Sequence, residues 1–164
     1  MAEKYAVVRT DNMTGSDVRS QLVSVKHMGA DGETPTAIEN GNVLALAGLM
    51  SGEREIFVGE VPAADADLNT IVLVASPEVL YDERDRNLSD FINEAGKPAR
   101  GYRLHSGDIF SVTEKALSGT PTVGGKVTLD AATKLAAGGS GTAVGTIIGK
   151  EVAGPLTFFV IEVA

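Results

Sequence analysis

The chain has 164 residues, of which 43% are hydrophobic and 22% charged, and its formal net charge is -8. A domain of about 150 residues buries roughly 70% of the surface of its unfolded chain, so this length can support one real core. The chain has no cysteine, which excludes a disulfide framework and a thiolate zinc site. We therefore expect one domain, or one and a half, held together by its core.

The excess negative charge lies entirely in residues 1–100, because basic and acidic side chains cancel in residues 101–164. An acidic chain repels phosphate backbones, and no basic stripe with interleaved aromatic residues is present. We expect no nucleic-acid partner. No run of 18 uncharged apolar residues occurs, and residues 1–10 include three charged side chains, so we expect a soluble protein without a signal peptide or membrane span.

Residues 1–17 predict an N-terminal arm, and residues 18–164 a single β-rich domain. The arm contains a candidate strand, Tyr5 to Arg9, in a largely polar context. Segments of this kind are often ordered on a partner, so the predicted interface residues are Tyr5, Val7, Val8 and Arg9. The alternative, an ordinary first strand of the domain, carries equal weight.

Residues 18–100 hold several short apolar runs. Residues 18–28 alternate loosely and suit a strand or a helix, whereas residues 43–50 favour a strand. Residues 56–59 and the β-branched run 71–74 predict two further strands. Residues 88–95 predict a short helix, because Asn87 or Ser89 can cap it and Gly96 followed by Pro98 ends it.

The last third of the chain contains four short alternating runs, at residues 107–113, 124–130, 144–150 and 155–163. A sub-division near residue 100 would make residues 101–164 a Gly-rich hairpin or barrel part. The final run is so apolar that it must be paired on both sides or covered. Residues 136–145, rich in Gly and Ala, predict a flexible hairpin tip. The fold class is therefore mainly β: a small antiparallel β-barrel or β-sandwich with one short helix and an N-terminal arm.

Several partial motifs for chemistry are present, and none is complete. Gly149 and Lys150 lack the spacing and the hydroxyl residue of a phosphate loop. Residues 65–69 match the first alternating oxygen ligands of a calcium loop, but its glycine and its bidentate glutamate are missing. His27 and His105 lie far apart, without a nucleophile elbow. The sequence therefore predicts no catalytic, cofactor-binding or metal-binding residues, no cofactor and no enzyme activity.

The order of these segments resembles the small decoration, or cement, proteins of tailed bacteriophage capsids. The likeness covers most of the chain in texture and order, ends in the Gly/Ala/Thr-rich β tail, and rests on no invariant motif. It is carried by the Asn-Gly-apolar segment at residues 40–46, the charged turn at 52–55, the loop at 77–82, and Gly101-Tyr102-Arg103-Leu104 leading to Gly107-Asp108-Ile109-Phe110.

This resemblance implies a structural virion protein, assembled in the host cytoplasm, that binds the outer surface of the shell and bridges capsomers. The implied partner is the major capsid protein, and the implied oligomer is a homotrimer or another homo-oligomer. One alternative is another phage structural component, such as a tail-tube or fibre-associated β-domain. A carbohydrate-binding β-module is a weaker alternative, because the chain has no Trp and few rings to stack on sugars.

Overall fold

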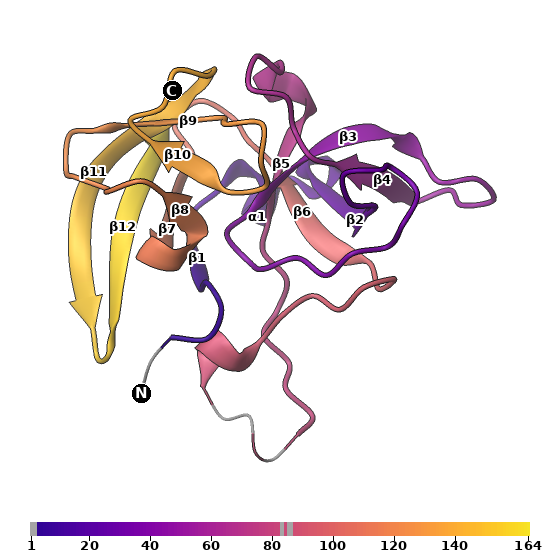
Figure 1. The fold of residues 1–164 in the computed structure, drawn as a ribbon, viewed down its shortest axis with the longest axis horizontal. Coiled ribbons are helices and arrows are strands. Elements are labelled where there is room, and N and C mark those ends of the chain that lie inside the picture. Colours follow the sequence, from indigo (N-terminus) through magenta and orange to yellow (C-terminus); the bar gives the residue numbers. More distant parts are fainter. Residues whose placement is uncertain (1–2, 83, 85–86) are drawn as a thin grey trace.

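The computed structural model describes residues 3–82, 84 and 87–164. This part of the chain is mainly β, with 42% of residues in strands. A closed barrel and a larger mixed sheet lie side by side, the barrel built from residues 22–103 and the sheet largely from the last third of the chain (Figure 1). The predicted fold class, mainly β with a barrel, is confirmed.

Within the described residues, five strands close into the barrel in the order β2-β4-β3-β5-β6, and β6 pairs with β2 to complete it. β2 and β4 are parallel, and the other neighbours are antiparallel. Closure leaves these strands without a free edge. The strands are β2 (Leu22–His27), β3 (Val43–Leu49), β4 (Ile56–Glu60), β5 (Ile71–Val74) and β6 (Ala99–Arg103).

Seven strands of the described chain form the mixed sheet, in the order β1-β7-β12-β11-β9-β10-β8. All neighbours are antiparallel except β10 and β8. The apolar strand β12 pairs with β11 on one side and β7 on the other, which confirms that it needs two partners. The strands are β1 (Val8–Asn12), β7 (Ile109–Thr113), β8 (Leu117–Ser118), β9 (Lys126–Thr128), β10 (Leu135–Ala137), β11 (Ala143–Ala153) and β12 (Leu156–Val163).

Strand β5 explains how the two parts share a core. All four of its residues are buried, because successive side chains point to opposite faces and both faces are covered. Ile71 and Leu73 belong to the cluster that also holds Phe110 and Ile161 of the mixed sheet. Val72 belongs to a second cluster inside the barrel. The division near residue 100 therefore separates two groups of strands but not two cores.

Backbone hydrogen bonds also join the barrel to the sheet. The Val43 N–H donates to the Thr133 carbonyl oxygen at 2.7 Å, and the Thr142 N–H donates to the Ala64 carbonyl oxygen at 2.8 Å. Between these contacts, Gly141 lies so close to the Leu129 and Ala64 carbonyls that a Cβ would overlap them. The Gly/Ala-rich segment is thus partly structural: Ala136 lies in β10, and residues 138–142 connect β10 to β11.

The prediction of a helix at residues 88–95 is wrong, because the short α-helix of the described chain lies elsewhere. Leu88–Asp90 forms a single 3-10 turn, η3, in which the Asn87 N–H donates to Asp90 Oδ2 at 3.1 Å. The chain then leaves helical geometry, because Asn93 pairs with Ile38 across an isolated β-bridge. The short α-helix of the described chain, α1, is Thr14–Asp17, and the other 3-10 turns are η1 (Arg19–Gln21), η2 (Leu68–Thr70) and η4 (Glu114–Ala116).

The N-terminal arm predicted for residues 1–17 is, in its described part, integrated into the domain. Strand β1 forms the edge of the mixed sheet against β7, and Ala6, Val8 and Met13 belong to the main core cluster. After β1 the chain passes through α1 and then enters the barrel. The first residue of α1, Thr14, is bound to Asp108, which directly precedes β7: Asp108 Oδ1 accepts hydrogen bonds from the Thr14 N–H at 2.8 Å and from the Thr14 hydroxyl at 2.6 Å. Of the two alternatives, the ordinary first strand is the one that the structure adopts.

Candidate interaction surface

The residues predicted as a protein interface have different positions in the fold. Val7 and Val8 are buried, with exposed fractions of 1% and 7%. The Arg9 guanidinium forms an ion pair with Glu151 at 2.7 Å and lies 4.1 Å from the centre of the Phe158 ring. Tyr5 is half-buried and its N–H donates to the Ser89 carbonyl oxygen at 2.8 Å. Val7 and Val8 are therefore part of the core, whereas Arg9 and Tyr5 remain partly exposed at the surface.

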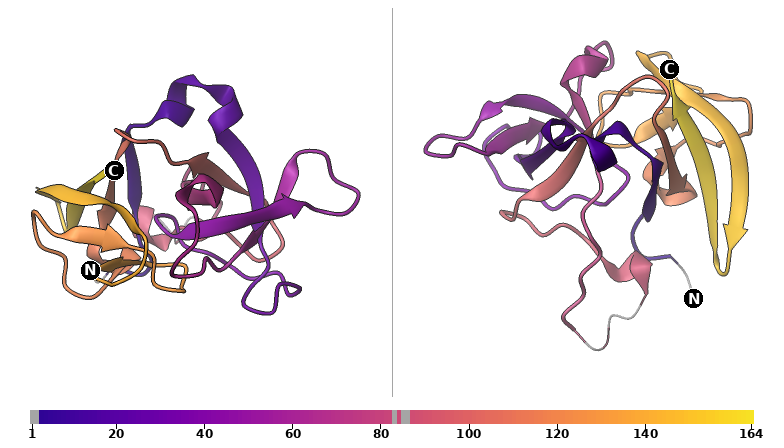
Figure 2. Two further views of the ribbon diagram at one scale, coloured as in Figure 1. Left: turned by 90° about the horizontal axis from the view of Figure 1, so that it is seen from above. Right: turned by 180° about the vertical axis from the view of Figure 1, so that it is seen from behind.

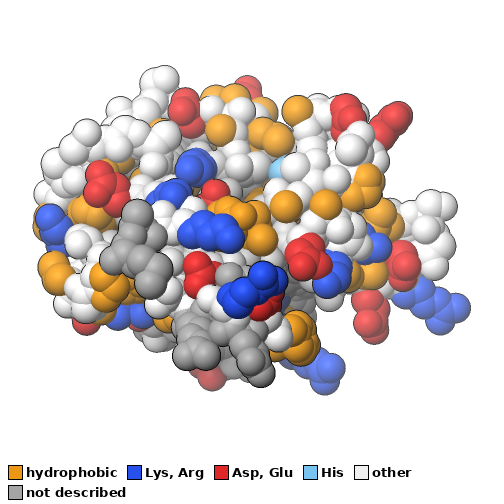
Figure 3. All heavy atoms as spheres, turned by 60° about the horizontal axis from the view of Figure 1, so that its bottom comes forward, with side chains coloured by type: hydrophobic (Ala, Val, Ile, Leu, Met, Phe, Trp, Pro, Cys, Tyr) orange, Lys and Arg blue, Asp and Glu red, His pale blue; other side chains and the backbone are white. Residues whose placement is uncertain are grey.

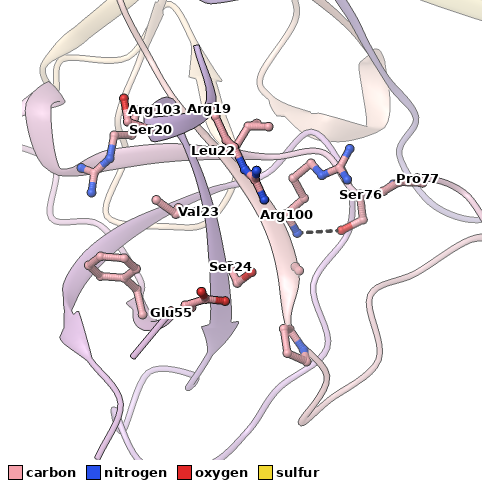
Figure 4. A pocket seen from close by; sticks show the side chains of 13 residues that line it. Arg19, Ser20, Leu22, Val23, Ser24, Glu55, Ser76, Pro77, Arg100 and Arg103 are labelled. Atoms are coloured by element: carbon pink, nitrogen blue, oxygen red, sulfur yellow. Dashed lines mark hydrogen bonds between the residues drawn. The ribbon is translucent and has the colours of Figure 1, made fainter. Parts of the chain in front are cut away.

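A groove of about 720 Å³ lies where β2 and β6 pair, and side chains from both faces of these strands line it (Figure 4). Its apolar lining includes Leu22, Val23 and Phe57, all half-buried. Successive residues of a strand face opposite sides: Leu22 packs against the core shared with the mixed sheet, and Val23 packs against the cluster inside the barrel. The groove therefore offers apolar surface on a rigid, closed framework.

Arginine side chains border this groove from separate elements. Arg19 comes from η1, and Arg100 and Arg103 come from β6. Figure 4 shows Arg19 and Arg100 on one side of β2 and Arg103 on the other. The Arg103 guanidinium lies 5.7 Å from the centre of the Phe57 ring. In the described part of the chain none of these guanidinium groups has a carboxylate partner, although Glu55 also lines the groove.

The loop of residues 76–98 forms a second hollow, of about 500 Å³, which shares Ser76, Pro77 and Pro98 with the groove. Its lining is amphipathic, and Tyr81 is 92% exposed. On this face, hydrophobic and charged side chains of both signs are intermingled (Figure 3). Tyr5, Leu80, Tyr81, Phe91, Ile92 and Lys97 are among the lining residues.

A buried amide network holds both ends of this loop against the barrel. Asn93 Nδ2 donates to the Ile38 carbonyl oxygen and to Asn40 Oδ1, both at 3.0 Å. Asn40 in turn accepts from the Ser76 N–H at 3.0 Å and donates to the Ser76 carbonyl oxygen at 2.9 Å. Long loops in compact domains are usually functional or disordered, and an anchored one suits binding. The network therefore supports a preformed surface around the loop.

The hairpin of β11 and β12 extends beyond the other strands of the sheet (Figures 1 and 2). Its turn has Gly154 at φ +61° followed by Pro155, and because proline cannot adopt positive φ this is the pattern of a type II′ turn. Near the tip Val152 is 69% exposed. β11 pairs with β9 as far as Thr146, and Ile147 bonds to the backbone of Gly124 and Gly125, so within the described part of the chain residues 148–153 have a free backbone edge. The hairpin is a second candidate contact region.

The histidines are separate and do not form a catalytic pair. His105 is exposed, with Nε2 2.7 Å from Gln21 Oε1. His27 is buried at the end of β2, and among the described residues neither ring nitrogen has a partner at hydrogen-bond distance and angle. Burial lowers the pKa of His27, and the nearby backbone of Ala37 and Thr36 opposes this shift. A buried, unpartnered ring at this position belongs to the packing of the barrel end.

The partial calcium loop has a structural role. The Asp67 carboxylate accepts the Asn69 N–H at 3.0 Å and so caps η2. Residues 3–82, 84 and 87–164 contain no group of three or more His, Cys, Asp or Glu side chains placed to hold a metal ion. Among the same residues, no helix has the length and apolar character needed to cross a membrane.

Comparisons with protein-family models, with curated proteins and with solved structures give no match. The fold and the surface geometry together define a mainly β protein with an anchored loop, an arginine-bordered groove and a projecting hairpin. The sequence reasoning missed the groove, because Arg19 and Arg100 are 81 positions apart in the sequence. The sequence also predicts no strand at β6, which carries Arg100 and Arg103.

Proposed function

We propose that this protein is a structural virion component that binds the outer surface of a tailed-phage capsid and stabilises the shell by bridging capsomers. The observation that carries the proposal is the continuous surface formed by the groove and the loop hollow, which share Ser76, Pro77 and Pro98. A surface with apolar lining, exposed rings and arginines suits a protein partner, because these residues dominate binding energy at interfaces.

Two physical features support a shell-binding role beyond the resemblance in sequence. The surface is preformed by a closed barrel and an amide network, so little conformational entropy is lost on docking. The projecting hairpin provides a second contact region on a different element, which a bridging protein needs in order to touch two subunits. The major capsid protein is the proposed partner, and the proposed location is the virion.

A second candidate function is a tail-tube or fibre-associated subunit, and the hairpin is what favours it. Exposed Ile148 and Val152 and the free edge of β11 could pair with another copy. If this edge pairs with a different surface of the next copy, the contact is head-to-tail and generates rings or filaments. A shell-binding protein should instead remain a monomer or a closed oligomer until capsid is offered.

Co-sedimentation with expanded, undecorated phage capsids tests the proposal, with the mass of the free protein measured in parallel. We expect saturable binding at a fixed copy number per capsomer and a monomer or closed oligomer in solution. Rings or filaments without capsid binding would favour the tail component. A plain monomer that fails to bind capsid would refute both candidates.

A further inference from the structure

We propose that the groove over β2 and β6 binds an extended, acidic segment of a partner protein. Carboxylates of the segment would pair with Arg19, Arg100 and Arg103, and its apolar side chains would pack on Val23 and Phe57. The inference rests on the proposed function only in taking the partner to be a protein.

The charge of the groove differs in sign from the charge of the molecule. The whole chain carries a formal charge of -8, yet the groove is bordered by Arg19, Arg100 and Arg103 against the one carboxylate of Glu55. Arg9, which lies outside the groove, differs from these three arginines, because its guanidinium already forms an ion pair with Glu151. Like charges gathered in a hollow raise the local potential and attract the opposite charge.

The chemistry of arginine indicates which anion fits. A guanidinium is planar, and its donors match the two oxygens of a carboxylate. Arg103 is also restrained, because its guanidinium lies 5.7 Å from the centre of the Phe57 ring, and the Arg100 backbone N–H donates to Ser76 Oγ at 3.0 Å, which fixes the backbone from which that side chain extends. A side chain that is already held in place, as Arg103 is, loses less entropy when it binds a ligand.

The floor of the groove favours a peptide over a nucleic acid. Leu22, Val23 and Phe57 offer apolar contact that a phosphate chain cannot use, whereas the apolar side chains of a mixed acidic and apolar segment can use it. A volume of about 720 Å³ lies within the range of small-molecule pockets, so the ligand is a short segment.

The test uses the full-length protein and fluorescein-labelled octapeptides in which Asp or Glu alternates with Val, Leu or Phe. The matched peptides carry Asn and Gln instead of Asp and Glu. We expect saturable binding of the acidic peptides, at least tenfold weaker binding of the amide peptides, and a dissociation constant that rises with salt. Equal binding of both peptide sets, or no binding of either, would overturn the inference.

Matched variants place the binding site on the protein. R19Q, R100Q and R103Q should each weaken peptide binding about threefold to tenfold, because a charge-assisted hydrogen bond is lost from a partly exposed site. K126Q removes the same charge from exposed Lys126 on β9 and should leave binding unchanged. If K126Q weakened peptide binding as much as the arginine variants do, the loss would come from the change in net charge, and the assignment of the binding site to the groove would be refuted. Because R103Q also loses a ring contact, R19Q carries the test if R103Q melts at a lower temperature.

Capsid co-sedimentation of the triple variant R19Q/R100Q/R103Q separates this inference from the proposed function. Loss of both capsid and peptide binding would support both. Peptide binding by the unmodified protein, without capsid binding, would refute the shell role and leave the groove assignment standing. Undiminished binding of both capsid and peptides by the triple variant would refute the groove assignment and leave the shell role. If the protein bound a dT12 oligonucleotide and not the acidic peptides, the inference of a protein ligand would be overturned in favour of a nucleic-acid ligand.

Discussion

At the scale of single residues, two glycines of β11 differ sharply in what surrounds them. A methyl group on Gly145 would overlap the Glu162 carbonyl oxygen of the paired strand, whereas one on Gly149 would meet Val160 at an ordinary 3.7 Å. The first position is a close backbone approach, and the second lies at a register shift between β11 and β12.

Gly145→Ala should therefore destabilise the protein by about 2 kcal/mol or more, since backbone must move to relieve the overlap. Gly149→Ala should change stability by less than about 0.5 kcal/mol, and it is the matched control on the same strand. Urea unfolding followed by circular dichroism measures both. Equal effects of the two variants would contradict the distinction.

His27 makes stability depend on pH. Burial lowers the folded-state pKa of this ring below its usual 6.5, so below about pH 6.5 the unfolded chain binds more protons than the folded one. The free energy of unfolding should accordingly fall as the pH drops through 6.5 towards the lowered pKa. Asp31 acts in a separate window, because hydrogen bonds from Thr34 and Glu33 lower its pKa to about 2.

His27→Leu should flatten this dependence between pH 7.5 and 5.5, as measured by urea unfolding at closely spaced pH values. Loss of stability through Asp31 should begin only near pH 3.8 and continue towards pH 2, because its lowered pKa stabilises the charged form. A wild-type curve that is already flat above pH 5.5 would contradict the role of His27.

At the scale of elements, the N-terminal strand decides how much of the chain is needed to fold. The Thr113 N–H donates to the Val7 carbonyl oxygen at 3.0 Å, and the Val7 N–H donates to Thr113 Oγ1 at 3.0 Å. Val7 and Val8 are buried. Strand β1 and the residues just before it are therefore part of the folded domain.

Deletion of residues 1–10 should lower stability by about 4 kcal/mol or more, because two buried valines at roughly 1.5–3 kcal/mol each are lost with their hydrogen bonds. The melting temperature should fall by many degrees. Arg9→Ala keeps the strand and removes only the contacts with Glu151 and Phe158, so it should cost about 1 kcal/mol. A deletion variant that melts like the full chain would restore the arm interpretation.

At the scale of the whole molecule, the shared core should make the barrel and the mixed sheet unfold together. Leu73 is fully buried in the cluster that spans both parts. Leu73→Ala should cost about 2–5 kcal/mol and weaken the protection of both parts equally. Hydrogen exchange followed by mass spectrometry measures this on peptides from β2–β6 and from β7–β12. Two separate opening energies would contradict a single cooperative unit.

Much of the local structure could be predicted from the sequence, because it depends on neighbouring residues. The runs at 43–50, 56–59 and 71–74 became β3, β4 and β5. The sequence does not predict β6, β8 or β10: β8 and β10 have two or three residues, too few to show a period of two, and β6 has no alternation of apolar and polar residues. The helix was misplaced because pairing of Asn93 with Ile38 overrides capping signals near residue 88.

The sequence by itself determined the acidic charge, the mainly β character, the turn glycines and the paired position of its last strand. These follow from composition and from patterns within a few residues. The tertiary structure alone decided that β1 joins β7, that β6 closes the barrel on β2, and that Arg19, Arg100 and Arg103 border one groove. The physical reason is that backbone donors and acceptors are the same in every strand, so the choice of partner comes from packing of distant side chains into a common core.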